Sequence, residues 1–301
     1  MDDPNFRRLI DKAGEGELTS PSTIRRMLGA IEYQLAPSRF SIQLTNDDAR
    51  LVKVDDVDLL CDLADRSVSL QLQLGVYEPH ITALFKRICT PGMTVVDVGA
   101  NVGYYALLAS DLVGPEGRVI AVEPSSENCR LLLTSMRLNQ RTNIVLFPVA
   151  CDANPGWAYY SKHIGSNGGF VDNDDLLSHP GVVVPTFRLE DLVDGPIDLL
   201  KLDVEGAEDR VVAGAHKLIE ECRPIVITEL SQEMLRRNSK TTAFSYLGYF
   251  EQLGYRLAVI DRSSEELKRY DSRQELLDGW NDLYQIEDLL LTPEEAEVSN
   301  S

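Results

Sequence analysis

Long apolar runs, paired cysteines and an excess of basic residues are all absent from this 301-residue sequence. No apolar run approaches the roughly 20 residues that a membrane-spanning helix needs. The acidic start, Met1-Asp2-Asp3-Pro4, lacks the apolar core of a signal peptide. The five cysteines are scattered and form no Cys-x-x-Cys pair, which argues against a zinc site and a disulfide framework. We therefore expect a soluble, cytoplasmic protein.

Charge is the strongest compositional feature. The sequence has 48 acidic and 29 basic residues, a formal net charge of −19. Such a surface repels phosphate backbones and anionic membranes, so we expect neither nucleic acid nor membrane as a partner. The charge keeps the protein soluble and says little about a small neutral substrate.

The first 75 residues predict an accessory segment. Ser20 and Pro37 delimit a helix with an apolar stripe at Ile24, Leu28, Ile31 and Leu35. Packing on the core is the favoured role of this stripe, and a lid or a homodimer contact are alternatives. Alternation of apolar and polar residues then predicts short antiparallel strands at 41–44, 50–54 and 67–72.

Strand and helix patterns alternate after residue 76. The periodicity predicts helices near 79–88, 104–112, 125–138, 207–220 and 242–253. This alternation is typical of a doubly wound, mostly parallel α/β sheet, which we place in a domain at 76–293, before an acidic tail at 294–301. The arrangement of the last two strands is left open by the pattern. The predicted strands are Thr94–Val98, Arg118–Val122, Ile144–Val149, Leu199–Leu202, Ile225–Glu229, Arg256–Ile260 and Asp288–Leu291.

A glycine loop follows the first of these strands. Gly99 allows a tight turn, and Gly103 lets the next helix begin close to a ligand, whose anionic group the free N–H groups would attract. A dinucleotide motif would have glycine at Asn101, and the Asp97 carboxylate would repel a pyrophosphate. Asp97 suits the ammonium and sulfonium groups of S-adenosylmethionine instead, so the loop favours that cofactor over NAD.

Two further acids follow neighbouring strands. Glu123, with Pro124 behind it, ends the second strand 24 residues after Gly99. An acid at this position accepts hydrogen bonds from ribose hydroxyls, which supports a nucleoside ligand without selecting one. Asp152 follows the third strand after Ala150, and it either meets the adenine amino group or is an ordinary turn aspartate.

Three more acids are predicted at the same edge of the sheet. Asp203 ends the fourth strand, Glu205 comes two residues later, and Glu229 ends the fifth strand. Crowded carboxylates raise one another's pKa and mark a candidate acid–base site. Glu208 is expected to have a structural role instead, as a helix cap or in a pair with an arginine. Clustered oxygens also suit magnesium, but no spacing demands a metal and we predict none.

Three sequence blocks together resemble the FkbM-type methyltransferases, a branch of the class I S-adenosylmethionine-dependent fold. The blocks are Tyr77-Glu78-Pro79, residues 97–105 (DVGANVGYY) and residues 200–208 (LKLDVEGAE), within a match that spans about 75–292. The resemblance implies a Rossmann-like, seven-stranded sheet with an antiparallel last strand. It also implies methylation of hydroxyls on sugars or secondary metabolites, and a role for Glu78 at the methionine end of the cofactor.

We therefore expect an S-adenosylmethionine-dependent O-methyltransferase that acts on a small molecule. The candidate base is Asp203, with Glu205 and Glu229 orienting substrate or sharing the proton. His163 is the alternative candidate base. The other interpretation of this residue is a solvent-exposed loop histidine. A nucleotide-dependent oxidoreductase, a nitrogen acceptor and a non-catalytic domain are the alternatives. The candidate cofactor-binding residues are Tyr77, Glu78, Asp97, Gly99, Ala100, Asn101, Gly103, Tyr104, Glu123, Pro124, Ala150, Asp152 and Asp203.

Overall fold

The computed structural model describes residues 49–62, 65, 67–164, 167–170, 181–280, 282–296 and 298. The chain enters this part as an antiparallel hairpin of β1 (Ala49–Val54) and β2 (Val57–Asp62), which confirms the strand predicted at 50–54. Leu59 and Cys61 of the hairpin are fully buried in one core cluster with residues of the main domain. The helix predicted at 20–37 and the strand predicted at 41–44 lie outside the described residues.

The strand predicted at 67–72 is wrong, because these residues form helix α3 (Val68–Leu74). The carboxylate of Asp65 accepts hydrogen bonds from the backbone N–H groups of Ser67 and Ser69, at 2.8 and 2.9 Å. Val68 and Leu72, four residues apart, are buried on one helix face, whereas Leu70 between them is 40% exposed. The alternating apolar residues therefore lie on different sides of a helix.

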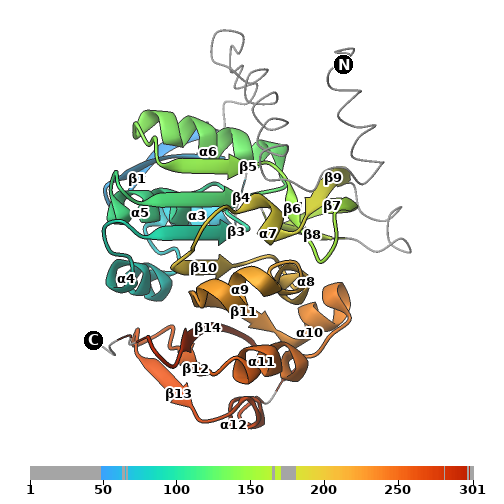
Figure 1. Cartoon of the computed structure of the whole chain (residues 1–301). Helices are drawn as coiled ribbons and strands as arrows, with labels where there is room; N and C mark the ends of the chain where they lie inside the picture. Colours follow the sequence, from blue (N-terminus) through green and yellow to red (C-terminus); the bar gives the residue numbers. More distant parts are fainter. Residues whose placement is uncertain are drawn as a thin grey trace.

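The main sheet confirms the doubly wound α/β prediction. Its eight strands have the order β13-β12-β14-β11-β10-β3-β4-β5 (Figure 1). Five strands are parallel, and β14 (Ile286–Pro293) lies antiparallel between β11 and β12. The parallel strands are β3 (Thr94–Val98), β4 (Arg118–Val122), β5 (Ile144–Phe147), β10 (Leu199–Leu202) and β11 (Ile225–Ser231).

The predicted seven strands are joined by an eighth at the edge. After β12 (Tyr255–Ile260), a turn leads into β13 (Leu267–Tyr270), which pairs antiparallel with β12. The centre of β13 is Lys268-Arg269, and such charges are tolerated on an edge strand that faces solvent. Because its central residues are charged, the strand is not detected by a search for apolar periodicity.

Helices cover both faces of the main sheet (Figure 1). Helices α4 (Pro79–Ile88) and α5 (Tyr104–Val113) bury apolar residues in the cluster on one face, where α6 (Ser126–Leu138) also contributes Leu132. The other face is covered by α7 (Leu189–Leu192), α8 (Glu208–Ala213), α9 (His216–Cys222), α11 (Ala243–Gln252) and α12 (Arg273–Asp278). The short α10 (Gln232–Met234) and the π-helical turn η2 (Leu235–Ser239) connect β11 to α11.

The helix predicted at 207–220 is divided into α8 and α9. Gly214 ends α8, and a Cβ built on it would lie 2.2 Å from the carbonyl oxygen of Asp152. The chain therefore turns where only glycine fits against the neighbouring loop.

A small second sheet lies beside the carboxyl ends of β4 and β5 (Figure 1). It has the order β6-β9-β7-β8, built from β6 (Ala150–Cys151), β7 (Gly156–Ile164), β8 (Asn167–Phe170) and β9 (Gly181–Phe187). The strand predicted at Ile144–Val149 ends at Phe147, and β6 begins the second sheet. No prediction included this sheet, which forms one wall of the candidate site.

No described helix combines the length and the apolar character needed to cross a bilayer. The five cysteines are free thiols, and all except Cys222 are buried.

Candidate functional site

A cavity of about 930 Å³ opens at the carboxyl ends of the central strands. This position, at the carboxyl edge of the sheet, is where doubly wound sheets bind ligands. The second sheet and α3 add walls on opposite sides of the opening. The predicted site residues that line the cavity are Tyr77, Glu78, Gly99, Asn101, Glu123, Pro124, Ala150, Asp203, Glu205 and Glu229.

The glycine loop packs tightly against the end of β10. Gly99 has φ +87°, and a Cβ built on it would lie 1.8 Å from the carbonyl oxygen of Asp203. Gly103 has φ +93°, and its Cβ would lie 2.2 Å from Leu132 Cδ1. Glycine at these positions lets the loop, strand β10 and helix α6 approach one another.

Four N–H groups of this loop are already bound within the protein. Gly99 and Ala100 donate to the carbonyl oxygen of Val122 at 2.9 and 3.1 Å, and Gly103 donates to that of Ala100 at 2.8 Å. Asn101, at φ +51°, donates its backbone N–H to Glu123 Oε2 at 2.9 Å. The loop therefore shapes the cavity wall, whereas these particular N–H groups bind within the protein.

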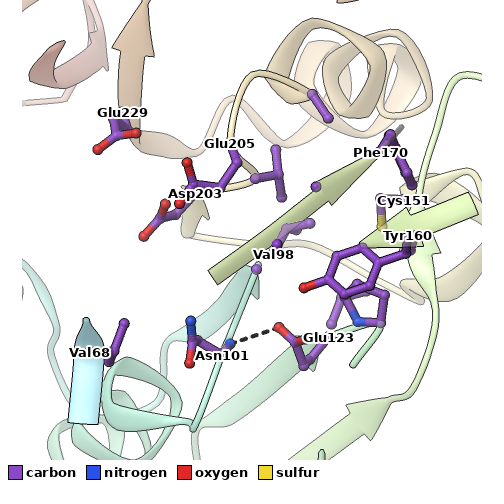
Figure 2. Close-up of a pocket in the computed structure, with 18 of the residues that line it drawn as sticks. Val68, Val98, Asn101, Glu123, Cys151, Tyr160, Phe170, Asp203, Glu205 and Glu229 are labelled. Atoms are coloured by element: carbon purple, nitrogen blue, oxygen red, sulfur yellow. Dashed lines mark hydrogen bonds between the residues drawn. The ribbon is translucent and has the colours of Figure 1, made fainter. Parts of the chain in front are cut away.

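Glu123 is a buried carboxylate at the cavity wall. Its side chain accepts a hydrogen bond from Asn101 N–H (Figure 2). Through Oε1 it also accepts from Ser125 N–H at 2.8 Å and Asn128 Nδ2 at 3.3 Å. The residue is only 3% exposed. These donors orient the carboxylate where the sequence placed a ribose acceptor.

Asp203, Glu205 and Glu229 lie together on the opposite side of the cavity from Glu123 (Figure 2). Lys201 Nζ lies 2.8 Å from Asp203 Oδ2 and 4.8 Å from the centre of the Tyr105 ring. Burial alone would lower the pKa of Lys201, but the carboxylates of Asp203, Asp97 and Glu78 outweigh it and raise that pKa. Lys201 is therefore a permanent cation beneath the acids.

Glu229 is the most perturbed of these acids. Burial raises its carboxyl pKa to about 9, with added repulsion from Asp203, Glu205, Glu208 and Asp288. The side chain lines both the main cavity and a smaller cavity of about 220 Å³. An acid with this pKa holds its proton at neutral pH.

Glu78 and Asp97 are both close to this charge network. Glu78, at φ +39°, accepts a hydrogen bond from Tyr105 Oη at 2.8 Å, and burial, with Asp203, raises its carboxyl pKa to about 7. Asp97 is 1% exposed and does not line the cavity. Burial raises its pKa to about 6, which Lys201 and the Ala106 amide only partly offset.

Other predicted residues lie away from the cavity. Asp152 does not line it, and its carboxylate pairs with Arg210 through an Nε–Oδ1 contact of 3.0 Å and a second contact from Nη2. Tyr104 donates its hydroxyl to Asp55 at 2.8 Å instead of facing a ligand. Glu208 accepts hydrogen bonds from the N–H groups of Val204 and Gly206, a structural role as expected. His163 belongs to β7, but its side chain is outside what the structure describes.

Sequence reasoning missed the wall that the second sheet provides. Tyr160, only 6% exposed, and Phe170 line the cavity from paired positions on β7 and β8. A Cβ on Gly168 would lie 2.4 Å from the Tyr160 hydroxyl, so glycine there makes room for the tyrosine. Residues 156–164 show no regular alternation of apolar and polar residues, so the glycine pair before Phe170 was the available signal.

Two curated relatives are methyltransferases. The Arabidopsis thaliana protein named as the rRNA 2′-O-methyltransferase fibrillarin 3 is 38% identical over 97 residues, 30% of this chain and 31% of that protein. A protein-L-isoaspartate O-methyltransferase from Methanopyrus kandleri is 41% identical over 69 residues, 21% of this chain and 30% of that protein. The chain thus spans about a third of the length of these relatives.

A solved structure and a family match complete the comparison. The crystal structure of Methyltransferase FkbM from Methylobacillus flagellatus superposes with a TM-score of 0.43 and 16% identity, over 76% of this chain and 55% of that one. The Methyltransferase FkbM domain matches residues 97–257, which is more than half of the 301 residues. This match confirms the resemblance seen in the sequence blocks. The chain belongs to the FkbM family of S-adenosylmethionine-dependent methyltransferases.

Proposed function

We propose that this chain transfers a methyl group from S-adenosylmethionine to a hydroxyl of a small molecule, such as a sugar or a secondary metabolite. The observation that supports this most directly is the layout of the cavity. A buried carboxylate suited to ribose, Glu123, lies across one space from the acids Asp203, Glu205 and Glu229 (Figure 2). Donor and acceptor can therefore share the same cavity.

The charge of the lining fits this methyl donor. Five acidic side chains line the cavity, of which Glu229 is protonated at neutral pH, and no lysine, arginine or histidine does so among the described residues. S-adenosylmethionine supplies a methyl group on a sulfonium cation, which such a lining attracts, whereas it would repel the pyrophosphate of a dinucleotide. The lining and the family match together argue against the oxidoreductase alternative.

Each part of the donor has residues that suit it. We assign the ribose to Glu123 and the methionine end to Glu78 with Tyr77. The adenine would lie among Ala150, Cys151 and Tyr160, where the walls are largely apolar. Asp97 and Asp152, which do not line the cavity, are assigned no direct contact.

The chain's part in the reaction is mainly alignment. Holding the acceptor oxygen in line with the transferred group supplies several orders of magnitude in rate. An aliphatic hydroxyl must also lose its proton, and we assign that proton to Asp203. Lys201 holds this carboxylate in place, with Nζ 2.8 Å from Asp203 Oδ2.

The acidic lining favours oxygen over nitrogen as the acceptor atom. Carboxylates stabilise the protonated form of an amine, which has no lone pair to accept a methyl group. The negative charge of the protein also disfavours the acceptors that the relatives' names describe. RNA brings phosphates and isoaspartate brings a carboxylate, and both are repelled by a chain of net charge −19.

Labelled methyl transfer tests this proposal. The full chain, with S-adenosylmethionine labelled in the methyl group, is offered hydroxylated metabolites, amines, RNA and isoaspartyl peptide in parallel. We expect label on a hydroxyl compound, and the ether identified by mass spectrometry. Label on an amine, the RNA or the peptide would overturn the assignment.

Two organisational features are also proposals. We place the accessory segment at 1–75, the methyltransferase domain at 76–293 and the tail at 294–301, and limited proteolysis tests these boundaries. A homodimer through residues 20–37 would show as twice the chain mass in light scattering. Loss of the dimer in Leu28→Asp is the expected check.

A further inference from the structure

The basic side chains described near Glu229 are engaged by other acids. On the β10 side, Lys201 pairs with Asp203 at 2.8 Å. On the β14 side, Asp288 Oδ2 lies 2.8 Å from His80 Nε2 and 2.9 Å from Arg262 Nε. Glu205 and Glu208 add only negative charge from the loop and α8. No described residue forms a hydrogen bond or an ion pair with the Glu229 carboxyl.

Glu229 lines two neighbouring cavities. One is the main cavity, and the other is the small cavity that Glu78, Asp203, Lys201 and Asp288 also line. Burying an unpaired carboxylate among like charges is unfavourable, so the free protein keeps a proton there instead. A ligand that brings its own cation could replace that proton.

We infer that the acceptor carries a protonated amine near its hydroxyl and that Glu229 binds this ammonium group. The inference rests on the proposed function, because it concerns the acceptor half of the same cavity. The ribose of the donor would lie away from this acid, since Glu123 and Asn101 lie across the cavity from Glu229 (Figure 2). The amine stays protonated and serves for recognition, while the neutral hydroxyl next to Asp203 is the group that is methylated.

Binding of matched fragments tests this inference without knowledge of the natural acceptor. Ligand-observed NMR measures 2-aminoethanol, ethylene glycol and glycolate with the full chain loaded with S-adenosylhomocysteine. These probes share a hydroxyl and differ in charge. We expect 2-aminoethanol to bind at least about tenfold more tightly than the other two, as for a charge-assisted hydrogen bond.

Two variants assign the preference to Glu229. Glu229→Gln keeps the shape of the protonated carboxyl but cannot ionise when an ammonium group binds, and we expect it to abolish the preference. Glu116→Gln makes the same change on the exposed loop before β4, away from the cavity, and should leave the preference intact.

The outcomes separate the inference from the proposed function. Failure of S-adenosylhomocysteine to bind would contradict the donor site and the proposed function with it. Retained binding of S-adenosylhomocysteine with no preference for 2-aminoethanol, including no binding by any fragment, overturns the inference alone. A preference that persists in Glu229→Gln also overturns it.

Discussion

Lys201 and Asp203 form a partly buried ion pair at the end of β10, with Nζ 2.8 Å from Oδ2. Lys201 is 4% exposed and also lies beside β3, where its register partner is Asp97. One cation therefore compensates several carboxylates at the point where the glycine loop, β10 and α4 meet. The pair links the stability of the fold to the charge of the cavity.

Removing this cation should destabilise the protein. Lys201→Met leaves Asp203, Asp97 and Glu78 without their compensating charge, and we expect a loss of roughly 3–5 kcal/mol in the free energy of unfolding. Urea denaturation measures this loss. Lys217→Met is the control, since that side chain is 73% exposed and should change stability by less than about 0.5 kcal/mol. Equal stability of the two variants would contradict the role of Lys201.

Neutralising Asp203 should affect turnover more than donor binding. Asp203→Asn cannot take the acceptor's proton, so we expect turnover to fall roughly 10²–10⁴-fold. The dissociation constant for S-adenosylhomocysteine, measured by calorimetry, should change far less. Turnover equal to that of the natural chain would eliminate Asp203 as the base and leave His163 to be tested.

Gly92 and Gly99 have nearly the same φ angle but differ in the space around them. Alanine substitutions at the two positions therefore distinguish the cost of backbone strain from the cost of a steric clash. Gly92 has φ +91° and open space around a built Cβ, whereas Gly99 has φ +87° and the Asp203 carbonyl 1.8 Å away. We expect Gly92→Ala to cost about 1–2 kcal/mol. Gly99→Ala should cost about 1–3 kcal/mol more, because loop and strand must separate. Thermal or urea unfolding compares them, and equal costs would show that the close approach is unimportant.

Stability should depend on pH through Glu229. The unfolded chain releases this proton near pH 4.5, whereas the folded protein holds it up to about pH 9. Between these values the folded state binds one more proton, so its stability falls as the pH rises, by up to about 1.4 kcal/mol per pH unit. Glu229→Gln removes this loss, since the amide does not titrate.

We therefore expect Glu229→Gln to match the natural chain in Tm near pH 4 and to exceed it increasingly toward pH 8. Differential scanning fluorimetry across this range measures the difference. The other raised carboxyls, Glu78, Asp97 and Glu208, are present in both proteins and largely cancel in the comparison. A constant difference in Tm would show that Glu229 titrates normally.

The central α/β pattern was predictable because its local signals agree with its packing. Helix α4 begins at Pro79 and ends before Pro91-Gly92 as expected, and β4 spans Arg118–Val122 as predicted. Both elements have apolar patterns that match the faces they bury. The positions of Glu123 and Asp203 in the site were predictable from the strand pattern, because both residues end parallel strands whose carboxyl ends share one edge of the sheet.

The remaining parts depend on contacts that local patterns do not encode. The strand predicted at 67–72 is a helix because Asp65 and the buried pair Val68 and Leu72 stabilise one. Asp152 satisfied the expected position for an adenine contact, but Arg210 lies close enough to bind it. The cavity wall at Tyr160 arises from strand pairing across a segment with no clear sequence pattern.

Calorimetric titration of the full chain with S-adenosylhomocysteine and with NAD tests the central claim most directly. The account predicts that S-adenosylhomocysteine binds with one site per chain and that NAD does not bind. Glu123→Gln should weaken that binding roughly 10–100-fold through loss of a charged hydrogen-bond acceptor, whereas Glu116→Gln should not. Binding of NAD without S-adenosylhomocysteine, or unchanged affinity in Glu123→Gln, would contradict the account.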